Sequence, residues 1–188
     1  MLFRSRTSTA PASTTCEQLV TEGVNAARDN QLDVAERVLA AAVSCPGSAA
    51  ARELAGVRLL QKRWEDVDAL ASTAVEQAPR DSYAWKLLGT ARFIEDDPLG
   101  ALDTWNHARE PLLDLVQVDG LRHTRHRVVE RLIGAKGGET LTAGRFVRAR
   151  RRLAELPSAA TSRLTYAPAA GGHAELRGAV VERSLLPT

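Results

Sequence analysis

Aromatic residues make up only 4% of this 188-residue chain, which also has just two cysteines and one methionine. So few aromatic side chains leave little for stacking on nucleic-acid bases, and a formal net charge of +2 gives no strong overall attraction to a polyanion. No window of about 18 apolar residues is present. The longest uncharged stretch, 38–51, is interrupted by Pro46 and Gly47. These absences exclude a membrane-spanning helix and argue against a nucleic-acid-binding protein.

The remaining composition, 44% apolar and 26% charged, is typical of a soluble globular protein with one domain or two small ones. Residues 1–15 are rich in Ser, Thr and Ala and lack the apolar block of a secretory signal. We expect this segment to be a flexible tail. With no visible signal, the chain taken by itself reads as cytoplasmic.

A pattern of small and large apolar residues repeats along the N-terminal half at a shift of 34 positions. The later copy has them at offsets 0, 3, 4, 16, 20 and 23: Trp85, Leu88, Gly89, Ala101, Trp105 and Ala108. The earlier copy has, at the same offsets, Ala51, Leu54, Ala55, Val67, Ala71 and Ala74. A looser copy 32 residues upstream contains Leu19, Gly23, Ala35, Leu39 and Ala42. Stacked helical hairpins explain the pattern, because small residues let paired helices approach closely and large ones fill the space between pairs.

Over residues 16–110 the pattern resembles the tetratricopeptide repeat (TPR), with three copies. The resemblance implies a superhelix that binds peptides or protein surfaces on the concave face formed by the first helix of each pair. The family's groove positions correspond here to Val20, Val24, Arg52, Gly56, Tyr83, Lys86 and Thr90. Of these, the candidate partner-binding residues are Arg52, Tyr83, Lys86 and Thr90. No Asn occupies these positions, so the carboxylate clamp of one TPR subfamily is not expected; Arg52 and Lys86 would meet an acidic segment or simply form a solvated face.

From residue 111 onward the repeat stops and the charge changes sign. Residues 111–188 hold 13 Lys+Arg and 7 Asp+Glu, a net charge of +6, whereas the rest of the chain carries −4. This change predicts a second domain at 111–188. Periodicity and turn residues predict a strand at 113–121, helices at 125–133 and 142–156, and strands at 162–167 and 174–183. The residues expected to share apolar faces include Leu113, Leu115, Val128, Val129, Leu176, Ala179 and Val181. The predicted fold class is therefore mainly α plus α+β, a three-repeat helical-hairpin superhelix followed by a β-α-α-β-β domain.

The order of elements in 113–183 resembles a POTRA domain, the periplasmic module of outer-membrane barrel assembly and translocation proteins. Three short motifs carry the resemblance: Gly138 with Leu141 and Thr142, then Leu156 with Pro157, then Val181 with Glu182 and Arg183. The resemblance implies one sheet of three strands, both helices on one face, and a second strand that forms an exposed edge and can add a client strand. That edge is 162–167, where Arg163 and Thr165 point away from the core. Alternatively, the edge is merely protected and binds nothing.

Three groups of residues could take part in catalysis or ligand binding, but each lacks the further residues that such a site requires. A solvated helix face explains the arginines of 145–152 without nucleic acid or anionic lipid. His123 and His126 could share a metal, with Glu130 the nearest third ligand, but exposed histidines near a helix start explain them better. The glycine-rich stretch 134–140 lacks the spacing of a phosphate-binding loop. We therefore expect no enzymatic activity, no cofactor and no metal site.

The two cysteines bear on the cellular compartment in which the protein resides. Cys16 and Cys45 would lie at the same end of the first helical hairpin, because each is about 14 or 15 residues from its tip. They either form a disulfide, which would favour an oxidising compartment, or are two buried thiols.

Together these features favour a non-enzymatic protein–protein interaction module. We expect it to be an internal piece of a larger outer-membrane barrel protein. On this view the module faces the periplasm, docks a partner on its TPR-like repeats and handles client polypeptides at the edge strand, and it contacts the membrane only indirectly, through a barrel that the sequence lacks. The alternative is a cytoplasmic TPR adaptor whose basic C-terminal domain contacts an acidic partner.

Overall fold

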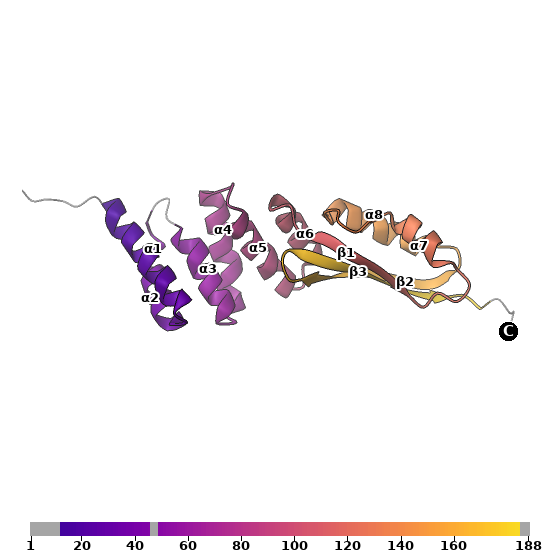
Figure 1. The fold of residues 1–188 in the computed structure, drawn as a ribbon, viewed down its shortest axis with the longest axis horizontal. Coiled ribbons are helices and arrows are strands. Elements are labelled where there is room, and N and C mark those ends of the chain that lie inside the picture. Colours follow the sequence, from indigo (N-terminus) through magenta and orange to yellow (C-terminus); the bar gives the residue numbers. More distant parts are fainter. Residues whose placement is uncertain (1–11, 46–48, 185–188) are drawn as a thin grey trace, which may run out of the picture. The chain divides into compact units, whose positions relative to one another are not determined.

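The computed structural model describes residues 12–45 and 49–184 (Figure 1). Most of the tail expected at 1–15 lies outside the described residues, as does Pro46. The first helix, α1 (Ala12–Arg28), already includes residues 12–15. No proline or glycine stands between residues 12 and 22 to stop a helix there. The structure forms two compact units, divided between Glu95 and Asp96.

The first unit is a TPR-like array of helices, in which each helix packs on the next along the chain. After α1 come α2 (Leu32–Ala42), α3 (Ala50–Leu60), the short 3-10 helix η1 (Trp64–Asp66), α4 (Val67–Gln77) and α5 (Ser82–Ile94). Most residues of the repeat pattern are buried, with Ala35, Leu39 and Ala55 fully inaccessible, whereas Leu19 and Trp85 are only partly buried. A Cβ atom at Gly23 would lie 2.5 Å from Leu39 Cγ, so that glycine permits the close approach of α1 and α2.

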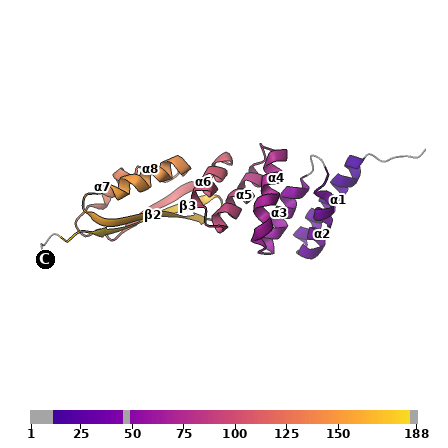
Figure 2. The ribbon, with the colours of Figure 1, turned by 180° about the vertical axis from the view of Figure 1, so that it is seen from behind.

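The second unit begins with α6 (Pro98–His107) and continues through β1 (Leu112–Asp119), α7 (His126–Ile133), α8 (Ala143–Ala154), β2 (Ala159–Ala169) and β3 (His173–Glu182). The strands form a mixed sheet in the order β1-β3-β2, with β1 parallel and β2 antiparallel to β3. Both α7 and α8 lie over one face of this sheet (Figures 1 and 2). The predicted order of one strand, two helices and two strands is therefore present.

The division between the units comes before α6, whereas the change in sequence pattern is at residue 111. Polar contacts explain why α6 belongs to the second unit. The Tyr166 hydroxyl donates to the Pro98 carbonyl at 2.7 Å, and burial together with the charge of Asp97 raises the pKa of that phenol. Asn106 donates to the Leu141 carbonyl at 3.1 Å and accepts from the Ala143 N–H at 3.1 Å. These bonds join α6 to α8 and β2, which the small/large repeat pattern could not show.

Three predictions about the second unit's faces are wrong. Leu115 is 51% exposed because a bulge between Leu113 and Leu115 shifts the alternation, so that Leu113 points inward as predicted but Val118 takes the place of Leu115 on that face. In β3 the buried residues alternate without interruption from Ala174 through Leu176 to Val180, which leaves Ala179 and Val181 on the open face. On α7, Val128 is 51% exposed, whereas Val129 and Ile133 are the buried residues of that helix.

Cap residues fix several helix ends. The Asp81 carboxylate accepts from the Tyr83 and Ala84 N–H groups, and Asp97 accepts from Gly100 N–H ahead of Pro98 at the first turn. Thr142 caps α8 through the Arg145 N–H, and Gly134 ends α7 with a left-handed φ of 65°. Within the described residues, no helix combines the length and the apolar content that spanning a membrane requires.

Candidate functional site

A groove of about 430 Å³ opens between α1, α3 and α5 in the first unit. Its lining is mainly apolar and comes from all three helices and from α2: Val24, Ala27, Arg28, Leu39, Glu53, Gly56, Val57, Leu59, Leu60 and Tyr83. Leu39 and Val57 are buried, whereas Leu60 and Tyr83 are 65% and 46% exposed. The groove therefore has an apolar floor and two large exposed side chains that another molecule could cover.

Gly56 and Tyr83 shape the groove together. A Cβ atom at residue 56 would lie 2.9 Å from the Tyr83 hydroxyl, so the glycine leaves room for the phenol above α3. Burial, and next the negative charge of Glu53, raise the pKa of Tyr83 above its ordinary value. The phenol is thus a neutral hydrogen-bond donor at physiological pH.

Arg52 is held inside the protein by two carboxylates. Its guanidinium lies 2.6 Å from Asp81 and is also paired with Glu53, and it stands 5.9 Å from the centre of the Tyr83 ring. Burial acts to raise the pKa of Asp81, but the hydrogen bonds from Arg52 and from the Ala84 N–H outweigh it and lower the pKa. Because its charge is already balanced, Arg52 supports Tyr83 rather than offering a free cation to an acidic ligand.

Lys86 and Thr90 lie on the same side of α5 as Tyr83, about one and two turns further along. The Thr90 hydroxyl donates to the Lys86 carbonyl at 2.8 Å, and neither residue lines the groove. A role in partner binding stays a prediction for these two residues and for Arg52. The structure therefore brings Tyr83, Gly56 and Val24 of the predicted set together in the groove.

Sequence reasoning missed Leu60, the most exposed apolar residue of the groove. A signal was available, because Leu59 and Leu60 are adjacent at the end of α3 and only one face of that helix can be buried. Arg28 and Glu53, which place one charge of each sign in the groove lining, were also missed.

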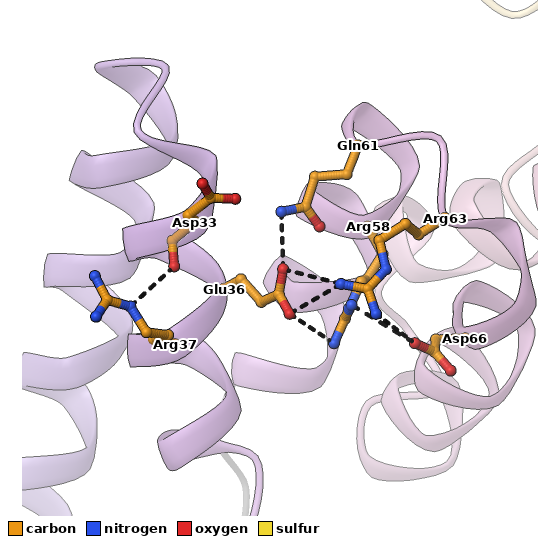
Figure 3. Close-up of polar contacts among 7 residues, drawn as sticks. All are labelled: Asp33, Glu36, Arg37, Arg58, Gln61, Arg63 and Asp66. Atoms are coloured by element: carbon orange, nitrogen blue, oxygen red, sulfur yellow. Dashed lines mark hydrogen bonds and ion pairs between the residues drawn. The ribbon is translucent and has the colours of Figure 1, made fainter.

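A polar cluster fixes α2 against α3 and so holds the groove-forming helices in place (Figure 3). Glu36 of α2 accepts from Gln61 Nε2 at 2.8 Å and pairs with Arg58 at 2.9 Å and Arg63 at 3.2 Å. The Gln61 hydrogen bond is the largest influence that lowers the pKa of Glu36; burial opposes it, and the charges of Arg58 and Arg63 add to the lowering. Asp66 lies further off, 3.7 Å from Arg58.

Strand β2 forms one edge of the sheet, since in the order β1-β3-β2 it pairs with β3 alone. Arg163 and Thr165 are exposed there, opposite in direction to the buried Leu164 and Tyr166. The other edge differs, because the loop before α8 bonds to the start of β1: Leu113 N–H donates to the Glu139 carbonyl at 2.9 Å. The role of Arg163 and Thr165 beside a bound client strand stays a prediction.

The remaining predicted positions have structural partners. Cys16 and Cys45 are joined by a disulfide, with Cα atoms 6.2 Å apart. The His123 N–H donates to the Glu182 carboxylate at 2.7 Å. Within residues 12–45 and 49–184, no three His, Cys, Asp or Glu side chains lie close enough together to hold a metal ion.

Comparison with known proteins gives a structural match but no family assignment. No family model matches the chain, and no curated protein matches it. Among the solved structures that match is the TPR domain of Sgt2 from Aspergillus fumigatus, at 25% sequence identity and a TM-score of 0.47. The match covers 53% of this chain and 65% of the Sgt2 chain.

Proposed function

We propose that the chain is a non-enzymatic protein–protein interaction module whose first unit binds a partner in the groove between α1, α3 and α5. One observation carries the proposal: the groove joins a buried apolar floor to the exposed Leu60 and Tyr83. Exposed aromatic residues such as Tyr83 are common anchors of protein–protein contacts, and an adjoining apolar side chain such as Leu60 adds area to bury. Arg28 and Glu53 add one charge of each sign, so the partner is held by apolar side chains and oriented by its charges.

The groove is tested by selecting peptides from a random display library with the full chain and measuring the Kd of the selected peptides by fluorescence anisotropy. Leu60→Ser should weaken binding at least tenfold, since it removes an exposed anchor. The matched control is Ile94→Ser, which changes another exposed apolar residue of the same unit outside the groove lining. Equal effects of the two substitutions, or a library that yields no binding peptide, would contradict the proposal.

We further propose that β2 receives a strand from a client polypeptide. An edge strand offers main-chain hydrogen-bond groups, which bind with little demand on sequence. The exposed Arg163 hinders self-pairing while it leaves the backbone accessible. Hydrogen exchange of the full chain with an unfolded β-barrel polypeptide diluted from urea tests this. Protection should rise in β2 and stay constant in the central strand β3, whereas unchanged exchange in β2 would contradict client binding.

The proposed setting is the periplasmic portion of a larger outer-membrane barrel protein. Its supports are the β-α-α-β-β order from β1 to β3 and the Cys16–Cys45 bond, which suits an oxidising compartment. The alternative is a cytoplasmic TPR adaptor, favoured by the net charge of +6 over residues 111–188, which would attract an acidic partner.

Fractionation of the native gene product separates these two settings. A heat-modifiable outer-membrane species much larger than 20.3 kDa is expected for the barrel protein. A soluble cytoplasmic species of 20.3 kDa would instead establish the adaptor.

A further inference from the structure

The layer formed by α7 and α8 carries the positive charge of the second unit. Residues 125–155 contain nine Lys+Arg and three Asp+Glu, a net charge of +6, which equals the net charge of all of residues 111–188. The side of both helices that faces the sheet is apolar. It packs on the sheet through Val129, Ile133, Phe146, Ala149 and Leu153. The arginines of this layer, whose two helices lie side by side in Figure 2, are all exposed and therefore belong to its outer surface.

Few of these cations are neutralised within the protein. Arg145 pairs with Glu139 at 2.6 Å, and Arg151 pairs with Glu155 at 2.9 Å. In the part of the chain that the structure describes, Arg127, Arg131 and Arg148 are exposed and make no ion pair. Guanidinium groups in this state are suited to phosphate, which accepts two parallel hydrogen bonds from one arginine.

Two exposed apolar residues lie on the same helices as the free arginines. Val128 of α7 is 51% exposed and Val147 of α8 is 41% exposed. On a helical wheel, Val128 is next to Arg131 and Val147 is next to Arg150, each three residues away, on the flanks of the outer side. Arginines beside apolar side chains on a helix that lies flat are typical of a surface that rests on anionic lipid, with cations at the phosphates and apolar groups at the acyl boundary.

A nucleic acid fits this layer less well. Base stacking requires exposed aromatic rings among the cations, but Phe146, the aromatic residue of these helices, is buried against Tyr166. We propose that the outer side of the α7–α8 layer binds the surface of an anionic phospholipid bilayer. This proposal does not depend on the groove or on the edge strand, because it uses neither.

Flotation of the full chain with vesicles tests the proposal. The vesicles are phosphatidylcholine alone or a 70:30 mixture with phosphatidylglycerol, at low and high salt. We expect binding to the mixed vesicles alone, and weaker binding as salt rises. The triple variant Arg127→Gln, Arg131→Gln and Arg148→Gln should lose about a hundredfold in affinity, since each basic residue near such a surface contributes roughly fivefold.

A matched triple variant separates the layer from overall charge. Arg37→Gln, Lys62→Gln and Arg80→Gln remove the same charge from exposed positions of the first unit outside the groove and should change binding by less than about threefold. Equal losses in the two triple variants, or no flotation with the mixed vesicles, would overturn the proposal.

The valines distinguish a bilayer from other polyanions. Val128→Ser with Val147→Ser should weaken vesicle binding severalfold and leave binding to heparin unchanged. If this double variant binds vesicles like the unchanged protein while duplex DNA or an acidic peptide binds as tightly as the vesicles, the layer is a site for a different polyanion and the bilayer proposal fails.

Discussion

Glu36→Gln should destabilise the first unit, because it leaves Arg58 without its nearest counter-charge. The Arg58 side chain is 14% exposed and that of Glu36 is 21% exposed. Hydration of the Arg58 guanidinium can therefore compensate only slightly for the lost ion pair. The substitution keeps the shape of residue 36 and can still form one hydrogen bond with Gln61 (Figure 3). The change therefore isolates the charge.

The expected loss is about 2 kcal/mol of unfolding free energy. A hydrogen bond to a charged group is worth about 1.5–3 kcal/mol, and removal of one member of a fully buried pair costs about 3–5 kcal/mol. The lower figures apply because both side chains keep some exposure and Asp66 remains 3.7 Å from Arg58. For a unit of this size, 2 kcal/mol corresponds to a fall in Tm of about 8–16 °C.

Differential scanning calorimetry of the full chain measures the loss, and native-state hydrogen exchange assigns the affected transition to the first unit. Glu76→Gln is the control, since Glu76 is exposed on α4. A double-mutant cycle with Arg58→Met should give a coupling of about 1 kcal/mol or more. A coupling near zero, or a Tm for Glu36→Gln equal to that of the control, would refute the reasoning.

Two further predictions concern other parts of the chain. Cys16→Ser with Cys45→Ser opens a loop of 29 residues and should lower the unfolding free energy by about 3–4 kcal/mol in urea titrations. Reductant should destabilise the unchanged protein but not this variant; if it affects neither, the bond is absent in solution. Hydrogen bonds from the Thr124 side chain and from the His123, Thr124 and Arg122 N–H groups lower the pKa of Glu182 from 4.5 to about 2. Its contribution to stability is complete above the unfolded pKa and is lost as pH falls from about 4.5 to about 2, so Glu182→Gln should flatten the pH dependence of Tm in that window. An unchanged pH profile would show that the carboxylate makes no such contribution.

Several local features could be predicted because they depend on neighbouring residues alone. Asp81 and Asp97 cap helices, and Gly134 ends one, through contacts within a few positions of the chain. The small residue at Gly23 marks a close approach of two helices joined by a short turn. In each case residue type and spacing contain the needed information.

Most errors arose where partners distant in sequence decide the outcome. A bulge in the pairing of β1 with β3 placed Leu115 on the open face. The error at Ala179 and Val181 was local instead, because alternation along a strand puts both on the face opposite Leu176. The groove needed Leu60 and Tyr83, whose helices are separated by α4 in sequence. The sequence also left open whether the two cysteines form a disulfide or remain two buried thiols. In the structure they form the disulfide.

The sequence by itself determined the helix-rich first half, the order of the second half and the concentration of positive charge in residues 111–188. These follow from periodicity, turn residues and composition, which are properties of short stretches. Tertiary structure alone decided that α6 belongs with the sheet, that Arg52 is neutralised by Asp81 and Glu53, and that the free arginines share one layer. The physical reason is that burial, ion pairing and shared surfaces depend on distances between residues far apart in the chain.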